Sequence, residues 1–144
     1  MTAQAPGLTQ IDALTETQIH DLLDLYRQAW WSAGRELEDV RRMLAHSDLI
    51  VGLCDRETHR LVGFARVVTD FVYKALVLDV IVTTTERGKG IGTALLDALI
   101  GHPALHSVRH FELYCRPEMV PFYTQWGFSA ALDGLQFMRL ERGR

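Results

Sequence analysis

The sequence predicts a mixed α/β fold, in which helices cover the faces of a sheet. Three observations lead to this prediction. Apolar residues recur at helical spacing near the N-terminus, between Ile19 and Tyr26. Runs rich in branched residues then alternate with polar turns from 49 to 82. A glycine-rich stretch follows and leads into a second helical pattern. The 144 residues are the usual length of one domain, so we expect a single domain over 1–144, with residues 1–7 flexible.

The first elements are expected to be a short strand and a helix. LTQID at 8–12 has the length and composition of a short strand. Thr15 and Gln18 have the spacing of a capping box. We therefore expect a helix from about 16 to 31, with Trp30 continuing its apolar stripe into the core.

A second helix and three strands are expected next. Leu37, Val40 and Leu44 have helical spacing, and this helix should end near residue 46. The last of the three runs, ALVLDVIV, is nearly continuous in apolar residues, which suits a central strand buried on both faces. The three expected strands are 49–55, 61–70 and 75–82.

The C-terminal part is expected to hold two helices and two strands. Apolar residues recur from 91 to 99, and Gly101 and Pro103 should stop that helix. A short helix should begin at Pro121, because proline fits the first helical position. The expected strands are 108–115 and 135–140, which gives six strands and four helices in all.

Composition and charge exclude several classes of protein. The net charge of −3 argues against a general nucleic-acid binder. No apolar run approaches the roughly 18 residues of a membrane span, and the first residues do not resemble a signal peptide. Cys54 and Cys115 lack paired spacing, so we expect reduced thiols, Cys115 as a small buried residue, and a cytoplasmic protein. The histidines also give no reason to expect a metal site.

The stretch ERGKGIG at 86–92 predicts an anion site. It lies between a buried strand and the start of a helix, where free amides and the helix dipole favour negative charge. Its glycines permit close approach to the backbone, and Arg87 and Lys89 add positive charge. A phosphate or pyrophosphate fits these features. The Walker and Rossmann patterns both fail, because Lys89 is not followed by Ser or Thr and no third glycine lies at the required spacing.

The remaining pattern, R-x-x-G-x-G at Arg87, Gly90 and Gly92, resembles the GNAT superfamily of acyl-CoA-dependent N-acyltransferases. PFYTQWGF at 121–128 is similar to a second signature of that family, F-Y-x-x-x-G-F. The resemblance covers about residues 48–140. It implies a central mixed sheet of six to seven strands with about four helices, and acetyl-CoA as co-substrate without a metal. The implied reaction is acetyl transfer to a primary amine by direct attack in a ternary complex. It further implies a small-molecule or peptide amine as acceptor, and a possible homodimer.

The same resemblance implies roles for two stretches of backbone and two aromatic residues. A bulge near the 80–82 strand backbone would free an amide to polarise the thioester carbonyl. Tyr123 matches the general acid toward the leaving thiolate, although a core aromatic is the alternative. The implied cofactor-binding residues are Val80, Ile81, Val82, Arg87, Gly88, Lys89, Gly90, Ile91, Gly92, Thr93 and Phe122.

Acidic and aromatic residues supply the remaining candidates. Asp79 interrupts an apolar strand, and a buried carboxylate is costly unless it is paired or lines a cavity. Asp79 or Glu112 could take the amine proton through water or attract a cationic substrate, or either could be a structural carboxylate paired with an arginine such as Arg66. The candidates for the acceptor pocket are Trp31, Asp70, Phe71 and Tyr73.

Two other functions stay open at this point. The chain could be a catalytically silent acyl-CoA-binding sensor or interaction module, which would need neither Tyr123 nor Asp79. It could also be an unrelated nucleotide-binding α/β protein. Thiol release across a panel of amines separates the first from an enzyme, and calorimetry with coenzyme A, ATP and NAD separates the second.

Overall fold

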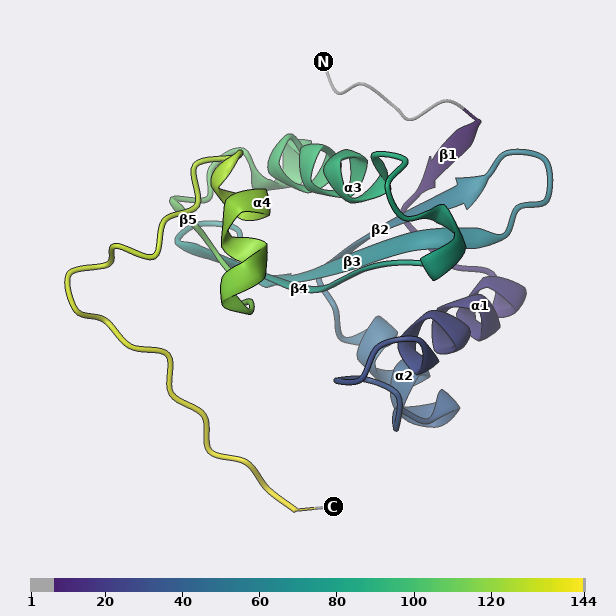
Figure 1. The fold of residues 1–144 in the computed structure, drawn as a ribbon, viewed down its shortest axis with the longest axis horizontal. Helices are drawn as coiled ribbons and strands as arrows, with labels where there is room; N and C mark the ends of the chain where they lie inside the picture. The colour runs from purple at the N-terminus through teal and green to yellow at the C-terminus, as the bar shows by residue number, and fades with distance from the viewer. Residues whose placement is uncertain (1–6, 144) are drawn as a thin grey trace.

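The computed structural model describes residues 7–143 and confirms the mixed α/β architecture (Figure 1). Five strands form one sheet in the order β1-β2-β3-β4-β5, antiparallel except for the parallel pair β4 and β5. Helices α1 and α2 lie on one side of the sheet and α3 on the other (Figure 1). The strands are β1 (Leu8–Ile11), β2 (Leu49–Asp55), β3 (Leu61–Thr69), β4 (Lys74–Val82) and β5 (His110–Glu112). The α-helices are α1 (Glu16–Arg27), α2 (Leu37–Ala45), α3 (Ile91–Ile100) and α4 (Val120–Thr124).

The capping box at the start of α1 is confirmed. The Thr15 hydroxyl accepts a hydrogen bond from the Gln18 amide at 3.2 Å, and the Gln18 side chain accepts one from the Thr15 amide at 3.0 Å. The end of α1 differs from the prediction, because the helix stops at Arg27. Buried Ser32 folds back and donates to the Tyr26 carbonyl at 2.8 Å. Trp30 therefore leaves the apolar stripe and is 73% exposed, so its expected place in the core was wrong.

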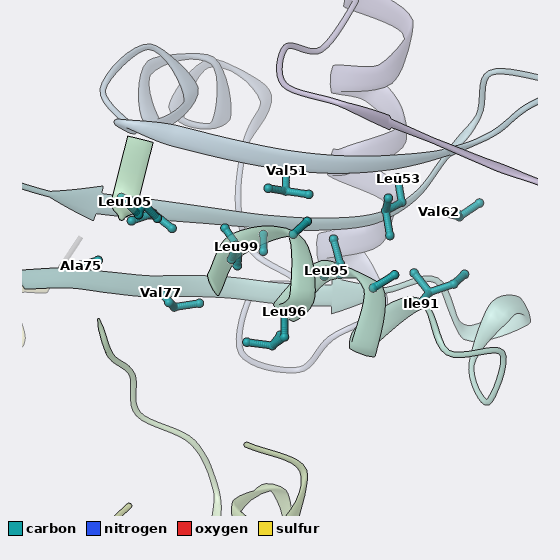
Figure 2. Packing of buried hydrophobic residues seen from close by; sticks show 14 residues of the cluster. Val51, Leu53, Val62, Ala75, Val77, Ile91, Leu95, Leu96, Leu99 and Leu105 are labelled. Carbon is teal, nitrogen blue, oxygen red and sulfur yellow. The ribbon is translucent and has the colours of Figure 1, made fainter. Parts of the chain in front are cut away.

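Two hydrophobic cores lie on the two faces of the sheet. One packs α1 and α2 against Phe64 and Ile81. The other packs α3, through Leu95 and Leu99, against side chains of β2, β3 and β4 (Figure 2). Leu95 is fully buried, and burial of such a side chain is worth roughly 1.5–3 kcal/mol. Strands β3 and β4 contribute to both cores, so the central sheet couples them.

Strand β4 contains a bulge near its middle. Phe64 pairs with Ile81 and Arg66 with Leu78, so Ala65 faces both Asp79 and Val80. Asp79 has a φ of +56°, a left-handed conformation that is rare for a residue other than glycine. On its other edge β4 pairs with β5 only from Lys74 to Leu76. The rest of that edge of β4 has no neighbouring strand in the described sheet.

The C-terminal region corrects two predicted strands. The strand expected at 108–115 is limited to the three residues of β5. The strand expected at 135–140 does not form in the single chain, where residues 129–143 have no regular secondary structure and are exposed. The described sheet therefore has five strands rather than the expected six or seven. After α4 the chain runs away from the sheet (Figure 1), so this segment has no strand to pair with.

Candidate active site

The glycine-rich loop lies between β4 and α3, after the 3₁₀ turn η1 (Thr84–Glu86). Gly88 and Gly90 have φ angles of +82° and +80°. A residue with a Cβ would be strained there by roughly 1–2 kcal/mol. These two glycines let the backbone turn sharply, so that α3 begins with Ile91 directly after the loop.

The first amides of α3 are available to a ligand. The first hydrogen bond of the helix joins the Ala94 amide to the Gly90 carbonyl at 3.0 Å. Within the described chain, the amides of Ile91, Gly92 and Thr93 have no hydrogen-bond partner, and no side chain caps the helix. Unpaired amides at a helix N-terminus attract anions. The diphosphate of coenzyme A fits this arrangement.

The two basic residues of the loop differ in their pairing. Lys89 donates to Glu86 at 2.9 Å, which partly neutralises its charge. Arg87 is exposed, and no ion pair involving it is found among the described residues. Arg87 is therefore the side chain whose full positive charge remains available beside the loop.

Helix α1 anchors the start of the loop. The side-chain oxygen of Gln28 accepts hydrogen bonds from the Thr84 amide at 2.9 Å and from the Thr83 hydroxyl at 3.3 Å. Gln28 is the C-cap residue of α1. The end of α1 and the entry to the loop are thus held together, a link between distant segments for which the sequence gives no signal.

Helix α4 and the turn that follows it pack against the first turn and the middle of α3. A Cβ at Gly92 would lie 3.3 Å from the Phe122 ring, so the absence of a side chain lets this ring approach the backbone. The Trp126 indole donates to the Asp97 carboxylate at 2.9 Å. Together these contacts bring the two sequence signatures into one site, with Tyr123 beside Phe122.

Tyr123 is half-buried and makes edge-to-face contacts with Phe122 and Phe128, at centroid distances of 5.0 and 6.0 Å. Its hydroxyl makes no hydrogen bond to the described residues. Burial, with a smaller effect from the charge of Cys115, raises the pKa of Tyr123 to about 12. Cys115 itself is exposed, so the expectation that it would be buried was wrong.

Asp79 is held by three side chains from three other segments. Its carboxylate accepts hydrogen bonds from Arg35 at 2.7 and 3.3 Å, from Arg66 at 2.7 Å and from the Tyr26 hydroxyl at 2.9 Å. The Asp79 side chain is 6% exposed. Burial alone would raise the pKa of Asp79, but the hydrogen bonds and charges of Arg35 and Arg66 bring it below its usual value. This arrangement matches the structural alternative, a carboxylate paired with arginines.

Arg35 and Tyr26 were not among the predicted site residues. The Arg35 guanidinium lies 4.5 Å from the centre of the Tyr26 ring and 5.5 Å from that of Trp31. These contacts place Trp31 next to the Asp79 cluster. A buried carboxylate did signal that cations must lie nearby, but it could not indicate which arginine in the chain would reach it.

The β4 backbone expected beside the pantetheine arm follows the bulge. Val80 and Val82 pack on the α3 side of the sheet, whereas Ile81 is buried on the α1 side. The bulge occupies Asp79 and Val80, at the start of the predicted stretch.

The other predicted residues lie at the opposite end of β4. Glu112 lies opposite Leu76 and is half-exposed. Its carboxylate forms an ion pair with the Lys74 ammonium group at 3.1 Å. The Asp70 carboxylate accepts hydrogen bonds from the amides of Val72 and Tyr73 at 2.9 and 2.8 Å, which shape the turn between β3 and β4. These backbone hydrogen bonds lower the pKa of Asp70. Phe71 and Tyr73 are exposed in this turn. The structure therefore does not bring these residues to the Asp79 cluster.

One contact joins the loop after α1 to the segment after β5. The Arg116 guanidinium lies 4.5 Å above the Trp30 ring. Arg116 was not a predicted site residue, and it brings the loop between α1 and α2 close to the segment that leads into α4.

Among the described residues, no group of histidine, cysteine and acidic side chains could hold a metal ion. None of the described helices is both long and apolar enough to cross a membrane.

Comparisons with known proteins agree with this geometry. A sequence model of the Acetyltransferase (GNAT) family matches residues 16–128. An uncharacterized N-acetyltransferase of Porphyra purpurea is 30% identical over 122 residues, which cover 83% of this chain and 70% of the relative. A protein of Oryza sativa subsp. japonica named serotonin N-acetyltransferase 2, chloroplastic, is 35% identical over 113 residues, which cover 76% of this chain and 56% of the relative. The chain thus spans little more than half of that rice protein.

A solved structure extends the similarity to the whole fold. The crystal structure of a GNAT-family acetyltransferase from Xanthomonas campestris pv. campestris matches with a TM-score of 0.78 and 30% identity. The match covers 95% of this chain and 96% of the other. Fold, sequence signatures and relatives lead to the same conclusion: the chain belongs to the GNAT family of acetyltransferases.

Proposed function

We propose that the chain is an acetyl-CoA-dependent N-acetyltransferase that moves an acetyl group to a primary amine by direct attack in a ternary complex. One observation carries the proposal. The unpaired amides at the start of α3 lie in the helical turn against which Phe122 packs. Tyr123 follows Phe122 directly in the sequence. A diphosphate site and a protonated phenol thus belong to one compact group of elements.

The loop residues bind the coenzyme in this proposal. The amides from Arg87 to Thr93 hold its diphosphate, and the guanidinium of Arg87 adds charge. The free edge of β4 at 80–82 lies along the pantetheine arm. When bound, acetyl-CoA supplies the acetyl group as an activated thioester. The chain's own part is to orient that group and to hold protons at defined atoms.

Tyr123 holds a proton toward the leaving sulfur. A phenol with a pKa of about 12 is fully protonated at neutral pH. Complete transfer of its proton to a thiolate, whose ordinary pKa is about 8.5, is uphill. We therefore assign the Tyr123 hydroxyl the role of hydrogen-bond donor to the departing sulfur, which water finally protonates.

The amine must lose its proton before it attacks, because an amine with a pKa of about 10.4 is almost entirely charged at pH 7. The carboxylate of Asp79 is engaged by two guanidinium groups and a phenol, so we assign it a positioning role. Water takes the proton in this proposal, because Glu112 lies at the opposite end of β4 and pairs with Lys74 at 3.1 Å.

A two-part experiment tests the proposal. Calorimetry with coenzyme A, ATP and NAD should give binding for coenzyme A only. Thiol release from acetyl-CoA is then followed across a panel of primary amines, which includes serotonin because of the name of the rice relative. Turnover of at least one amine is expected. Coenzyme A binding without turnover of any amine would support the silent acyl-CoA-binding module instead, and preferential binding of ATP or NAD would exclude both.

A further inference from the structure

We propose that Gln28 is a positioning residue for coenzyme A, because its side chain holds the entry of the glycine-rich loop in the conformation that binds the diphosphate. This inference rests on the proposed function, which takes that loop as the diphosphate site. It assigns part of the coenzyme affinity to a side chain of another element, 56 residues before Thr84 in the sequence.

The turn η1, which leads from β4 into the glycine-rich loop, is capped by Gln28. The N-cap residue Thr83 makes no capping hydrogen bond with its own side chain. Its hydroxyl instead donates to the Gln28 side-chain oxygen at 3.3 Å, and the same oxygen accepts the Thr84 amide at 2.9 Å. The Thr83 backbone is engaged elsewhere, with the Val62 carbonyl and the Glu86 amide at 2.9 and 3.0 Å. Gln28 therefore supplies the acceptor that the start of the turn lacks.

The end of α1 holds β4 at two points. The Tyr26 hydroxyl donates to the Asp79 carboxylate at 2.9 Å. Two residues later, Gln28 accepts the Thr84 amide. The backbone between these points includes residues 80–82, the free edge that the proposed function places along the pantetheine arm. One helix end thus fixes both ends of the backbone along which the coenzyme would lie.

The two roles of Gln28 are carried by different atoms. Its backbone amide caps α1 by donating to the Leu25 and Tyr26 carbonyls. Its side chain is exposed, and among the described residues it forms hydrogen bonds only with Thr83 and Thr84. A change of the side chain leaves the helix cap in place. Loss of the side chain should therefore affect the loop rather than the stability of the fold.

A loop that is held in its binding conformation loses less freedom when the ligand arrives. Without the Gln28 oxygen, η1 is free to change the direction in which the chain enters the loop, and Arg87 then leaves the diphosphate position for part of the time. The apparent affinity falls with the fraction of molecules that remain competent to bind. Turnover of the saturated enzyme should change little, because Tyr123 lies on α4 and not on the segment that Gln28 holds.

The first test compares coenzyme A binding by calorimetry in wild type and Gln28→Met. Methionine keeps the length of the side chain and removes the acceptor oxygen, so the dissociation constant should rise about 10-fold, the scale set by two hydrogen bonds. Gln10→Met, the same change at an exposed position of β1, is the matched control and should bind like wild type. Unchanged affinity in Gln28→Met would overturn the proposal.

Steady-state kinetics separates positioning of the coenzyme from a general structural role. With the amine that turns over best in the panel, Gln28→Met should raise the KM for acetyl-CoA about 10-fold and leave kcat within about 2-fold of wild type. A fall in kcat at an unchanged KM would contradict the assignment.

A double-mutant cycle with Thr84→Pro locates the effect. Thr83 has φ of −57° and ψ of 142°, which a following proline favours, and proline suits the first position of a helical turn. Thr84→Pro removes the amide that Gln28 accepts and fixes the turn through the proline ring. In that background Gln28→Met should raise the dissociation constant less than about 2-fold. A full 10-fold effect there would show that Gln28 acts at another place.

Hydrogen exchange at the Thr84 amide, followed by NMR without ligand, tests the anchor separately from the proposed function. The amide should exchange about 10-fold faster in Gln28→Met than in wild type, because it loses its acceptor, and Gln10→Met should not change the rate. Equal rates in wild type and Gln28→Met would overturn the anchor itself. If wild type fails to bind coenzyme A although the Thr84 amide depends on Gln28, the proposed function fails and the role in affinity fails with it.

Discussion

At the residue scale, Asp79 shows how one side chain can fix several segments. Its carboxylate joins Tyr26 of α1, Arg35 of the following loop and Arg66 of β3 to the bulge in β4. Charge-assisted hydrogen bonds of this kind are stronger than neutral ones. They also hold Asp79 in its left-handed backbone conformation, so the bulge and the loop that carries Trp31 depend on the same anion.

We expect Asp79→Asn to lower the free energy of unfolding by about 3 kcal/mol, because two buried or half-buried guanidinium groups lose their anion. Urea unfolding at pH 7 measures this change. Asp24→Asn is the matched control, since it removes a carboxylate that pairs with Arg27 on the exposed surface and should leave stability nearly unchanged. Equal stability of Asp79→Asn and wild type would show that the cluster does not hold the bulge.

The stability difference between wild type and Asp79→Asn should depend on pH. The pKa of Asp79 is lowered in the folded protein, so its stabilisation is fully present above the unfolded value of about 3.9 and is lost as pH falls through the folded value. The stability difference between wild type and Asp79→Asn should therefore be constant from pH 5 to 7 and shrink below pH 4. A difference that stays constant down to pH 3 would contradict the assignment.

We expect Tyr123→Phe to lower kcat about 100-fold, the lower end of the usual effect of removing a hydrogen-bond donor to developing negative charge, while coenzyme A affinity changes little. Because the pKa of Tyr123 is about 12, the phenol should not titrate between pH 6 and 10. Any change of kcat over this range should persist in the variant. Steady-state kinetics with the best amine of the panel measures both effects, and wild-type turnover in the variant would remove Tyr123 from the mechanism.

At the element scale, the start of α3 combines a conformational and a binding requirement. Gly90 is the N-cap residue with φ of +80°, and no side chain caps the helix. The helix thus begins with free amides instead of the Ser, Thr, Asp or Asn cap that most helices use. A side-chain cap would occupy the donors that a diphosphate requires.

We expect Gly90→Ala to weaken coenzyme A binding at least 10-fold and to destabilise the fold by about 1–2 kcal/mol, because alanine resists the left-handed conformation. Gly34→Ala is the control: it lies in a turn outside the loop, with no atom within 4 Å of an added Cβ and no positive φ. Calorimetry and thermal unfolding measure the two effects. Unchanged affinity in Gly90→Ala would show that the loop does not form the anion site.

The elements that could be predicted are those specified by local sequence. The capping box at Thr15 and Gln18, the start of α3 after Gly90 and the short helix with Pro121 were all predictable, because each depends on neighbouring residues. The end of α1 was missed, since Ser32 and the loop around it replace the last expected turn. The six-residue strand at 135–140 was predicted from its pattern alone, and a pattern cannot provide the neighbour that a strand needs.

The site could be predicted only where sequence signatures mark it. The two signatures indicated the glycine-rich loop and Tyr123 as candidates, whereas the packing of Phe122 against the first turn of α3 was not predicted. The partners of Asp79 were predictable only for Arg66, which lies on the adjacent strand. Arg35 and Tyr26 are 44 and 53 residues away in the sequence. Only the packing of α1 and its following loop onto the sheet brings them to the carboxylate.

At the scale of the whole molecule, the two cores share one sheet. Phe64 belongs to the α1 side and Leu95 to the α3 side, and both are fully buried. Because β3 and β4 contribute side chains to both faces, neither core can be lost while the sheet remains intact. The protein should therefore unfold as one cooperative unit, as small domains usually do.

We expect Phe64→Ala and Leu95→Ala to destabilise the protein by about 3–5 and 2–5 kcal/mol, each with a single unfolding transition. Far-ultraviolet circular dichroism and tryptophan emission should give the same midpoint in each variant. Exposed Val68→Ala serves as the control and should have little effect. Separate midpoints for the two signals would show that the α1 side and the α3 side unfold independently.

The positions of the three tryptophans have an optical consequence. Trp30 and Trp31 are exposed on the α1 side, whereas Trp126 is half-buried and bonded to Asp97 of α3. Replacing Trp30 and Trp31 by phenylalanine would leave one indole as an intrinsic fluorophore, close to the helix whose first turn we propose as the diphosphate site. Its emission wavelength and lifetime would then follow ligand arrival in real time, without any attached dye.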